Sequence, residues 1–146
     1  MSNDQARVEK FIVDLHKFIS DWVSGKETDK SKWDVFIKNL SPDFMVVMQA
    51  GKGFGVETFC GYMTSIHGKN PKFKIQIRNV KLRHKVNGVC VVMYEEWEKD
   101  AMDSDPPNNG RQSSMILRER GDSYEVLHLQ ETWLPAEQMK ADAFDF

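Results

Sequence analysis

The chain has 146 residues, with 20 Lys and Arg against 22 Asp and Glu, which gives a formal net charge of −2. This balance argues against a nucleic-acid-binding protein, because no excess of positive charge is present to neutralise phosphates. No apolar run approaches the roughly 20 residues that cross a bilayer, so we expect no membrane partner. The first residues, MSNDQARVEK, lack the pattern of a secretory signal, and we therefore expect a cytoplasmic protein.

The first half of the chain carries helical periods. Apolar residues recur every three or four positions in residues 4–24, which predicts an amphipathic helix ending at Gly25. A short second helix is predicted around Trp33 and Phe36, and it ends at Ser41-Pro42. Residues 44–48 are predicted to form a strand, and the glycine-rich turn 51–55 leads into a third helix. The inner face of that helix would carry Val56, Phe59, Cys60, Met63 and Ile66.

From Pro71 onward the period is two, which is typical of strands. The sequence predicts strands at 73–84 and 89–101, joined by Asn87-Gly88, a strong hairpin signal. A turn-rich loop at 102–110 precedes strands at 112–120 and 124–134 around Gly121-Asp122. The apolar parity switches near Arg78 and Asn79, which predicts a β-bulge there. Residues 1–135 are thus one α+β domain with three N-terminal helices against an antiparallel sheet, and residues 136–146 are a C-terminal tail.

The sheet is predicted to be apolar on both faces. Pairing across Gly121-Asp122 sets Leu117 opposite Val126 on one face, with Met115 opposite His128 and Ser113 opposite Gln130. The other face pairs Ile116 with Leu127. The helices cover one face, and we expect a second copy to cover the other, because large apolar patches usually mark interfaces. The alternative is a monomer whose surface carries scattered leucines.

The two cysteines, Cys60 and Cys90, are expected to be free thiols. They fall on a helix and on a strand with core-facing patterns, and disulfides are rare in proteins that are not exported.

The last hairpin, RQSSMILRERGDSYEVLHLQETWLP, resembles the closing hairpin of the nuclear-transport-factor-two-like superfamily. It is most similar to SnoaL-like proteins and to the association domain of the calcium/calmodulin-dependent kinase. Alternate residues of the final strand carry the likeness, and the order of elements extends it over nearly the whole chain. The resemblance implies a cone: a strongly curved sheet wrapped around a long helix, with an internal pocket and dimers formed through the sheet.

The resemblance also implies which residues line that pocket. Carried over by position, they are Tyr62, Met63, Met93, Glu95, Trp97, Ser113, Met115, His128 and Gln130. The association domain has arginines at the positions of Glu95 and Met115. Because this chain has a glutamate and a methionine at these positions, the resemblance implies a more acidic and apolar pocket here.

Glu95 and His128 form the best polar pair among those residues. A carboxylate beside an imidazole in an apolar site can act as acid and base. The alternative is a structural ion pair or a hydrogen-bonded core histidine.

No metal or cofactor is expected. His16, His67, His84 and His128 fall on different predicted elements and show no metal-ligand spacing. Glu125 and Glu131 flank His128 at intervals of three, but on a strand they face away from it.

The fold does not choose a function. The leading hypothesis is a homodimeric pocket protein that binds a small, largely apolar ligand or a protein segment, with no reaction demonstrable from the sequence. One alternative is a small lyase or isomerase that uses Glu95 and His128. Another is an oligomerisation module.

Overall fold

A computed structural model describes residues 2–146. It contains helices α1 (Ser2–Ser24), α2 (Lys30–Lys38) and α3 (Val56–Ser65). Its strands are β1 (Leu40–Val47), β2 (Gly53–Gly55), β3 (Lys74–Val86), β4 (Val89–Lys99), β5 (Asn109–Arg120) and β6 (Ser123–Trp133). Two short 3₁₀ turns, η1 (Ala136–Gln138) and η2 (Ala141–Phe144), end the chain. The three predicted helices and four long strands are confirmed.

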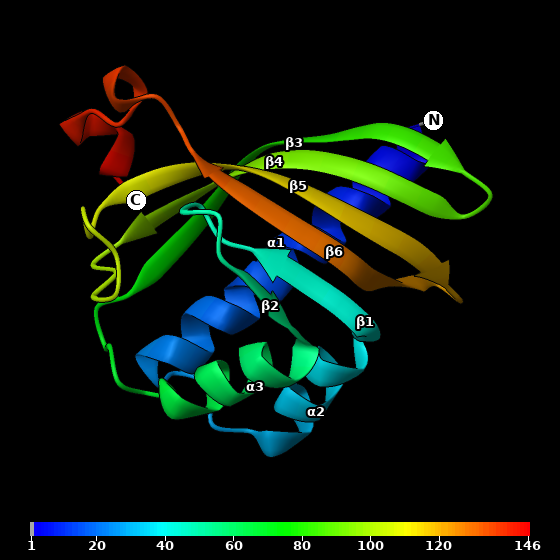
Figure 1. Ribbon diagram of the computed structural model, residues 1–146, viewed down its shortest axis with the longest axis horizontal. Helices are drawn as coiled ribbons and strands as arrows, with labels where there is room; N and C mark the ends of the chain where they lie inside the picture. The colour runs from blue at the N-terminus through cyan, green and yellow to red at the C-terminus, as the bar shows by residue number, and fades with distance from the viewer. Residues whose placement is uncertain (1) are drawn as a thin grey trace.

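The six strands form one curved sheet in the order β2-β1-β6-β5-β4-β3, and the helices gather on one side of it (Figure 1). We call the sheet face toward the helices the inner face and the opposite one the outer face. The four long strands are antiparallel, but β1 runs parallel to β6, so the sheet is mixed. The expected α+β architecture is confirmed, with this one parallel pair added.

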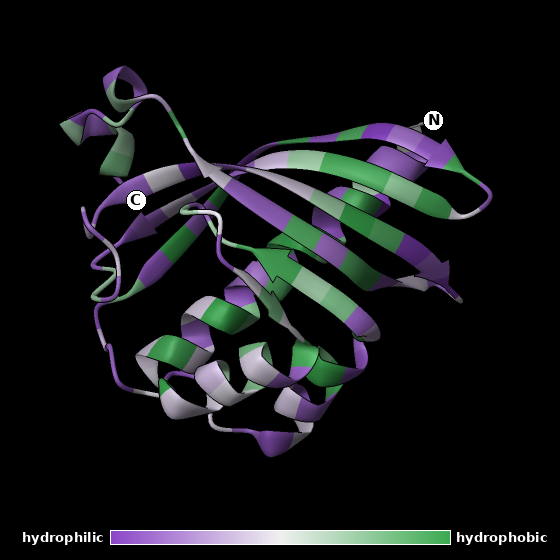
Figure 2. Cartoon of the chain, in the orientation of Figure 1, coloured by the Kyte–Doolittle hydropathy of each residue, from purple (hydrophilic) through white to green (hydrophobic). Residues whose placement is uncertain are grey.

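Helix α1 supplies the inner side of the core. Val8 and Ile12 are fully buried beneath the sheet, and the apolar stripe of the helix is visible in Figure 2. Farther along, Trp22 stacks on Trp33 of α2 with ring centroids 4.7 Å apart. The indole N–H of Trp22 donates to the carbonyl of Met63, which ties α3 to α1. Burying aromatic rings this large fixes where the three helices meet.

Bulges in β3 and β6 bend the sheet. In β3, Asn79 and Val80 together face Tyr94, and Asn79 adopts a positive φ of 56°. This confirms the bulge predicted at Arg78 and Asn79. In β6, Leu127 is an extra residue, because Leu117 pairs with Val126 and the next residue back, Ile116, pairs with His128. Bulges of this kind kink one strand and increase its twist, as a cone-shaped sheet requires.

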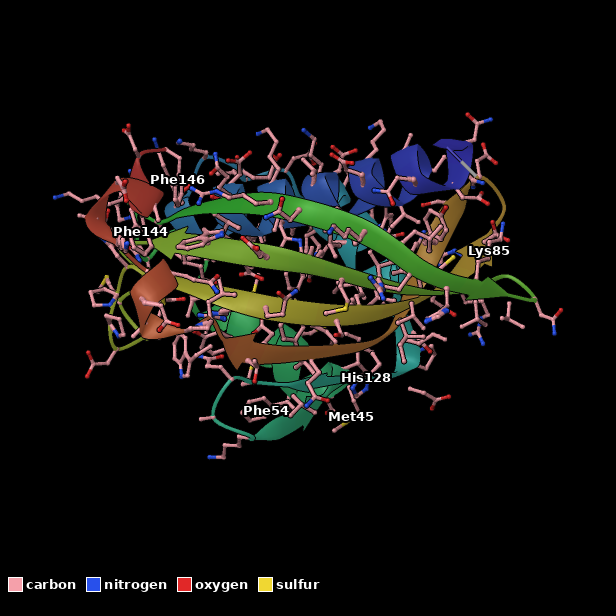
Figure 3. All side chains as sticks on the ribbon, turned by 90° about the horizontal axis from the view of Figure 1, so that it is seen from above. Met45, Phe54, Lys85, His128, Phe144 and Phe146 are labelled. Atoms are coloured by element: carbon pink, nitrogen blue, oxygen red, sulfur yellow. The ribbon has the colours of Figure 1, made fainter. Side chains whose placement is uncertain are left out.

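The C-terminal tail folds back onto the outer face. Phe144 packs edge-on against Trp97 of β4, at 5.4 Å between ring centroids. The guanidinium of Arg78 lies over the Trp97 ring and donates to the carbonyl of Ala143. Figure 3 shows Phe144 and Phe146 together at this end of the sheet. The tail therefore covers one end of the outer face.

Both cysteines are free, as predicted, and Cys90 is fully buried. Across residues 2–146, none of the helices combines the length and the apolar character needed to span a membrane.

Candidate functional site

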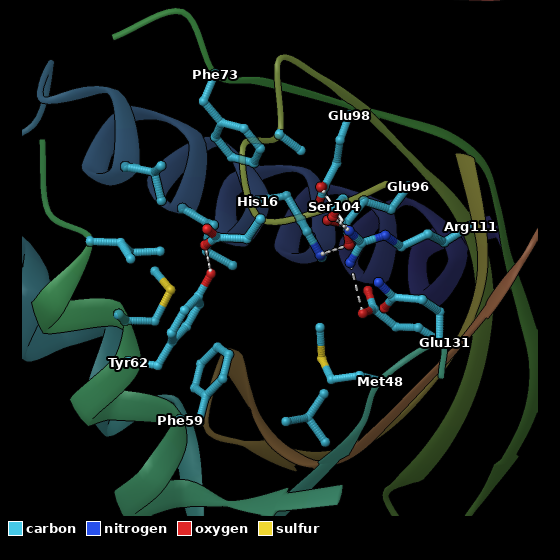
Figure 4. A pocket seen from close by; sticks show the side chains of 18 of the residues that line it. His16, Met48, Phe59, Tyr62, Phe73, Glu96, Glu98, Ser104, Arg111 and Glu131 are labelled. Atoms are coloured by element: carbon cyan, nitrogen blue, oxygen red, sulfur yellow. Dashed lines mark hydrogen bonds and ion pairs between the residues drawn. The ribbon is translucent and has the colours of Figure 1, made fainter. Parts of the chain in front are cut away.

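The inner face of the sheet and the helices enclose a cavity of about 440 Å³. This volume lies within the range of small-molecule sites, about 300–1,000 Å³. Figure 4 shows how α1, α3, the strands and the β4–β5 loop surround it. Its apolar wall consists of Ile19, Val23, Val46, Met48, Phe54, Phe59, Met63, Ile66, Phe73, Ala101, Met102 and Leu129.

Arg111 is the centre of the polar end of the cavity. Its guanidinium is held from two sides, with Nη2 2.8 Å from Glu98 Oε1 and Nη1 3.0 Å from Glu131 Oε1. Its Nε donates to Asn109, and Nη2 also donates to Ser104 of the β4–β5 loop. The side chains of Arg111, Glu98 and Glu131 are all at least 92% buried. Such pairs survive burial only when the geometry satisfies both partners.

His16 of α1 reaches the same cluster. Its Nδ1 lies 2.8 Å from the carbonyl oxygen of Ile12, and a carbonyl can only accept, so Nδ1 carries the proton. Its Nε2 lies 3.2 Å from Glu96 Oε1 and 3.3 Å from the hydroxyl of Tyr94. With both nitrogens protonated, the imidazolium donates to Ile12 and to Glu96 at once. A helix and a strand are thereby joined by a buried ion pair.

Burial and repulsion raise the pKa of two of the three carboxyl groups, whereas the adjacent His16 lowers the pKa of the third. Burial, followed by the hydrogen bond and repulsion from Glu96, raises the pKa of Glu98 well above its usual value. Burial and the Glu96 charge raise the pKa of Glu131 to about 8. Burial would also raise the pKa of Glu96, but the adjacent His16 outweighs it and lowers that pKa. Burial would lower the pKa of His16, but Glu96 holds it above its ordinary value.

A second polar contact links α3 to the loop between β4 and β5. The hydroxyl of Tyr62 donates to Asp103, and burial together with this bond raises the pKa of Tyr62. Both residues line the cavity. The contact ties the β4–β5 loop to α3, and Figure 4 shows it as a dashed line at the hydroxyl of Tyr62.

The structure separates the sequence-predicted pocket residues into three groups. Tyr62 and Met63 line the cavity. Ser113 and Met115 are buried on the inner face, within the core. The remaining predicted residues lie on the outer face, and they are Met93, Glu95, Trp97, His128 and Gln130.

Glu95 and His128 are not brought together. Glu95 pairs with Gln112 on β5, whereas His128 pairs with Ile116, four residues farther along that strand. The carboxylate of Glu95 accepts hydrogen bonds from Trp97 and Asn79, both at 2.9 Å. Neither side chain lines the 440 Å³ cavity, so the structure offers no acid–base pair at these two positions.

The Leu127 bulge explains the difference on β6. Counting alternate residues straight through the strand puts His128 and Gln130 inward, beside Met115 and Ser113. The bulge absorbs one residue, so Leu129 pairs with Met115 and Glu131 with Ser113. Met115 of β5 pairs with Val92 of β4. The inner face of β4 therefore carries Val92, Tyr94, Glu96 and Glu98, and the predicted residues Met93, Glu95 and Trp97 lie on the outer face.

Sequence reasoning missed the buried charges His16, Glu96, Glu98, Arg111 and Glu131. Two signals pointed to them. Arg111 precedes Met115 by four residues on a strand and therefore shares its inner face. His16 follows Ile12 by four residues and lies within the apolar stripe of the first helix.

Searches with sequence found no matching family model and no matching curated protein. Solved structures are similar in fold. An NTF-2-like protein of unknown function from Pseudomonas aeruginosa is 22% identical, with a TM-score of 0.79 over 88% of this chain and 99% of that one. A protein with a cystatin-like fold from Caulobacter vibrioides is 12% identical, with a TM-score of 0.66 over 96% and 94%. A CaMKII hub homology domain from Chlamydomonas reinhardtii is 11% identical, with a TM-score of 0.66 over 90% and 98%.

At these identities the likeness shows the fold alone. The chain has the NTF2-like, cystatin-like fold that the last hairpin and the order of elements indicated, and the expected resemblance is confirmed. Activity and partners do not follow from it.

Proposed function

We propose that the protein binds a small, largely apolar molecule in the 440 Å³ cavity, with the polar end of that molecule against the Arg111 cluster. The observation that carries the proposal is the combination of an apolar wall with one fixed polar end. Such a cavity fixes the orientation of a ligand by a few polar groups and gains affinity from apolar burial. Glu95 and His128 have no role in it, because they lie on the outer face.

Filling the cavity tests the proposal. Octanol is expected to bind the wild-type protein, and Met48→Trp is expected to weaken binding at least about tenfold, since the larger ring occupies space that the ligand needs. Met93→Trp makes the same change on the outer face and is expected to leave binding unchanged. Titration calorimetry measures all three. No octanol binding to the wild type, or equal binding by both variants, would refute a ligand cavity.

We further propose that the protein is a homodimer formed through the outer face of the sheet. Val91, Ile116, His128 and Met45 form a row across four adjacent strands of that face. Met45 is 39% exposed although it is a large apolar residue, and Figure 3 shows it beside His128. The structural likeness to a CaMKII hub homology domain supports an assembly role. The tail leaves this part of the face uncovered.

A lysine in that row should separate the subunits. Ile116→Lys is expected to give a single-chain mass in light scattering at concentrations where the wild type has twice that mass, because the interface would bury an unpaired charge. Val35→Lys, at a position 58% exposed on α2, is the matched control and should not change the mass. A wild-type protein that remains monomeric at high concentration excludes the dimer.

A further inference from the structure

The polar end of the cavity holds more acidic than basic groups. Glu96, Glu98 and Glu131 are each 5–6% exposed there. They face one guanidinium, that of Arg111, and one imidazole, that of His16. Even with His16 protonated, three carboxylates would exceed two cations by one.

The guanidinium of Arg111 is already engaged by the protein. Nε, Nη1 and Nη2 all have partners, and two of these partners are carboxylates. An anionic ligand would have to displace Glu98 or Glu131 before it could pair with Arg111. Lys69 also lines the cavity, but it is solvent-exposed and therefore a weak partner. The polar end is thus unfavourable to a carboxylate or phosphate.

Burial favours the protonated form of the excess carboxyl groups. The raised pKa values of Glu98 and Glu131 mean that a carboxyl group there keeps its proton at neutral pH. A cation in the cavity could take the place of such a proton, because it stabilises the ionised carboxylate instead. Binding of a cation would therefore release a proton.

An unpaired hydrogen-bond acceptor also lies at this cavity. The Oε1 atom of Gln49 is buried, lines the cavity region and has no donor partner among residues 2–146. Gln49 lies two residues beyond the end of β1, the strand next to β6, which carries Glu131. An ammonium group has three donors and no acceptor, and so matches a site that presents carboxylates and an unpaired amide oxygen.

We propose that the cavity selects molecules that have an apolar body and a basic amine at one end. The inference rests on the proposed ligand-binding function and adds the chemical class of the ligand. The amine would lie among Glu98, Glu131 and Gln49, and the body would lie along the wall formed by Met48, Phe59 and Met63.

Three probes with one chain length test it. Octylamine, octanol and octanoate differ only in the head, which is cationic, neutral or anionic at neutral pH. Octylamine is expected to bind at least about tenfold more tightly than octanol, and octanoate to bind most weakly. Calorimetry in buffers of different ionisation enthalpy should show release of a proton on binding of octylamine and none on binding of octanol.

A charge-reversing variant supplies the second measurement. In Glu98→Gln/Glu131→Gln, Arg111 loses both carboxylate partners, so the preference should change from octylamine to octanoate. Glu125 lies on the outer face of β6, the strand that carries Glu131. Glu125→Gln is therefore the matched control and should keep the wild-type preference for octylamine. Octanol binding reports that the cavity of each variant is intact.

The outcomes separate the two proposals. Equal affinity for the three probes, or a wild-type preference for octanoate, overturns the amine selectivity and leaves a ligand cavity. Failure of all three to bind overturns the ligand-binding function itself. If the double variant does not fold, the wild-type ranking and the proton count still decide the question.

Discussion

Replacing Arg111 with alanine is expected to lower the free energy of unfolding by about 3–5 kcal/mol, the usual cost of removing one partner from a buried ion pair. The side chain is 95% buried and holds Glu98 and Glu131, which would then face each other without a cation. Asn109 and Ser104 would lose a donor as well. Urea denaturation followed by tryptophan fluorescence measures the change.

Arg118 provides the control on the same strand. It also pairs with a glutamate, Glu125, but its side chain is 53% exposed, so Arg118→Ala should cost only about 0–1 kcal/mol. A similar loss of unfolding free energy in both variants would contradict a stabilising role of the buried ion pairs. Adding Glu98→Gln and Glu131→Gln to Arg111→Met should recover part of the stability, because the unpaired charges are then removed with the cation.

Stability is expected to fall as pH rises from about 5 to about 8. Glu98 and Glu131 have raised pKa values in the folded protein, so in this window the folded state binds protons that the unfolded chain has released. His16 acts in the same direction, because its raised pKa gives a stabilisation that is present below about 6.5 and is lost as pH rises through the folded value. Glu96 acts in the opposite direction, since its stabilisation is present above about 4.5 and is lost in acid.

Each proton bound only by the folded state changes the unfolding free energy by at most about 1.4 kcal/mol per pH unit. A loss of a few kcal/mol across the window is therefore expected from denaturation curves at several pH values. Glu131→Gln should flatten the profile, whereas Glu125→Gln on the outer face should not. A wild-type profile that rises toward pH 8 would contradict the assignment of the raised carboxyl groups.

The elements were predictable because their signals are local. The stripe of the first helix and the Asn87-Gly88 turn each depend on residues close together in sequence, and both are found in the structure. The parallel pairing of β1 with β6 was not predictable in this way, because it joins Val46 to Leu129 across most of the chain. Local patterns contain no information on such contacts.

The inner face was harder to predict than the elements. Both parities of β4 begin with apolar residues and then reach a glutamate, Glu95 on one and Glu96 on the other, so alternation alone does not distinguish the two. Charged residues such as Arg111 and Glu131 are assigned to the surface by default, since burial without partners is costly. Their partners come from three strands and one helix, and become visible only when the strands are in register.

The Leu127 bulge has a consequence for how this fold can diversify. It lies where β1 is also irregular, between the Leu40–Val126 and Met45–His128 pairs. On one side, Leu117 and Val126 close the core; on the other, Leu129 and Glu131 face the cavity. Losing Leu127 would restore simple alternation and still leave Val126, Leu129 and Glu131 inward. Loss of one residue is therefore tolerable at this position of β6, and the residues that face the cavity can change while the closed half of the strand keeps its packing.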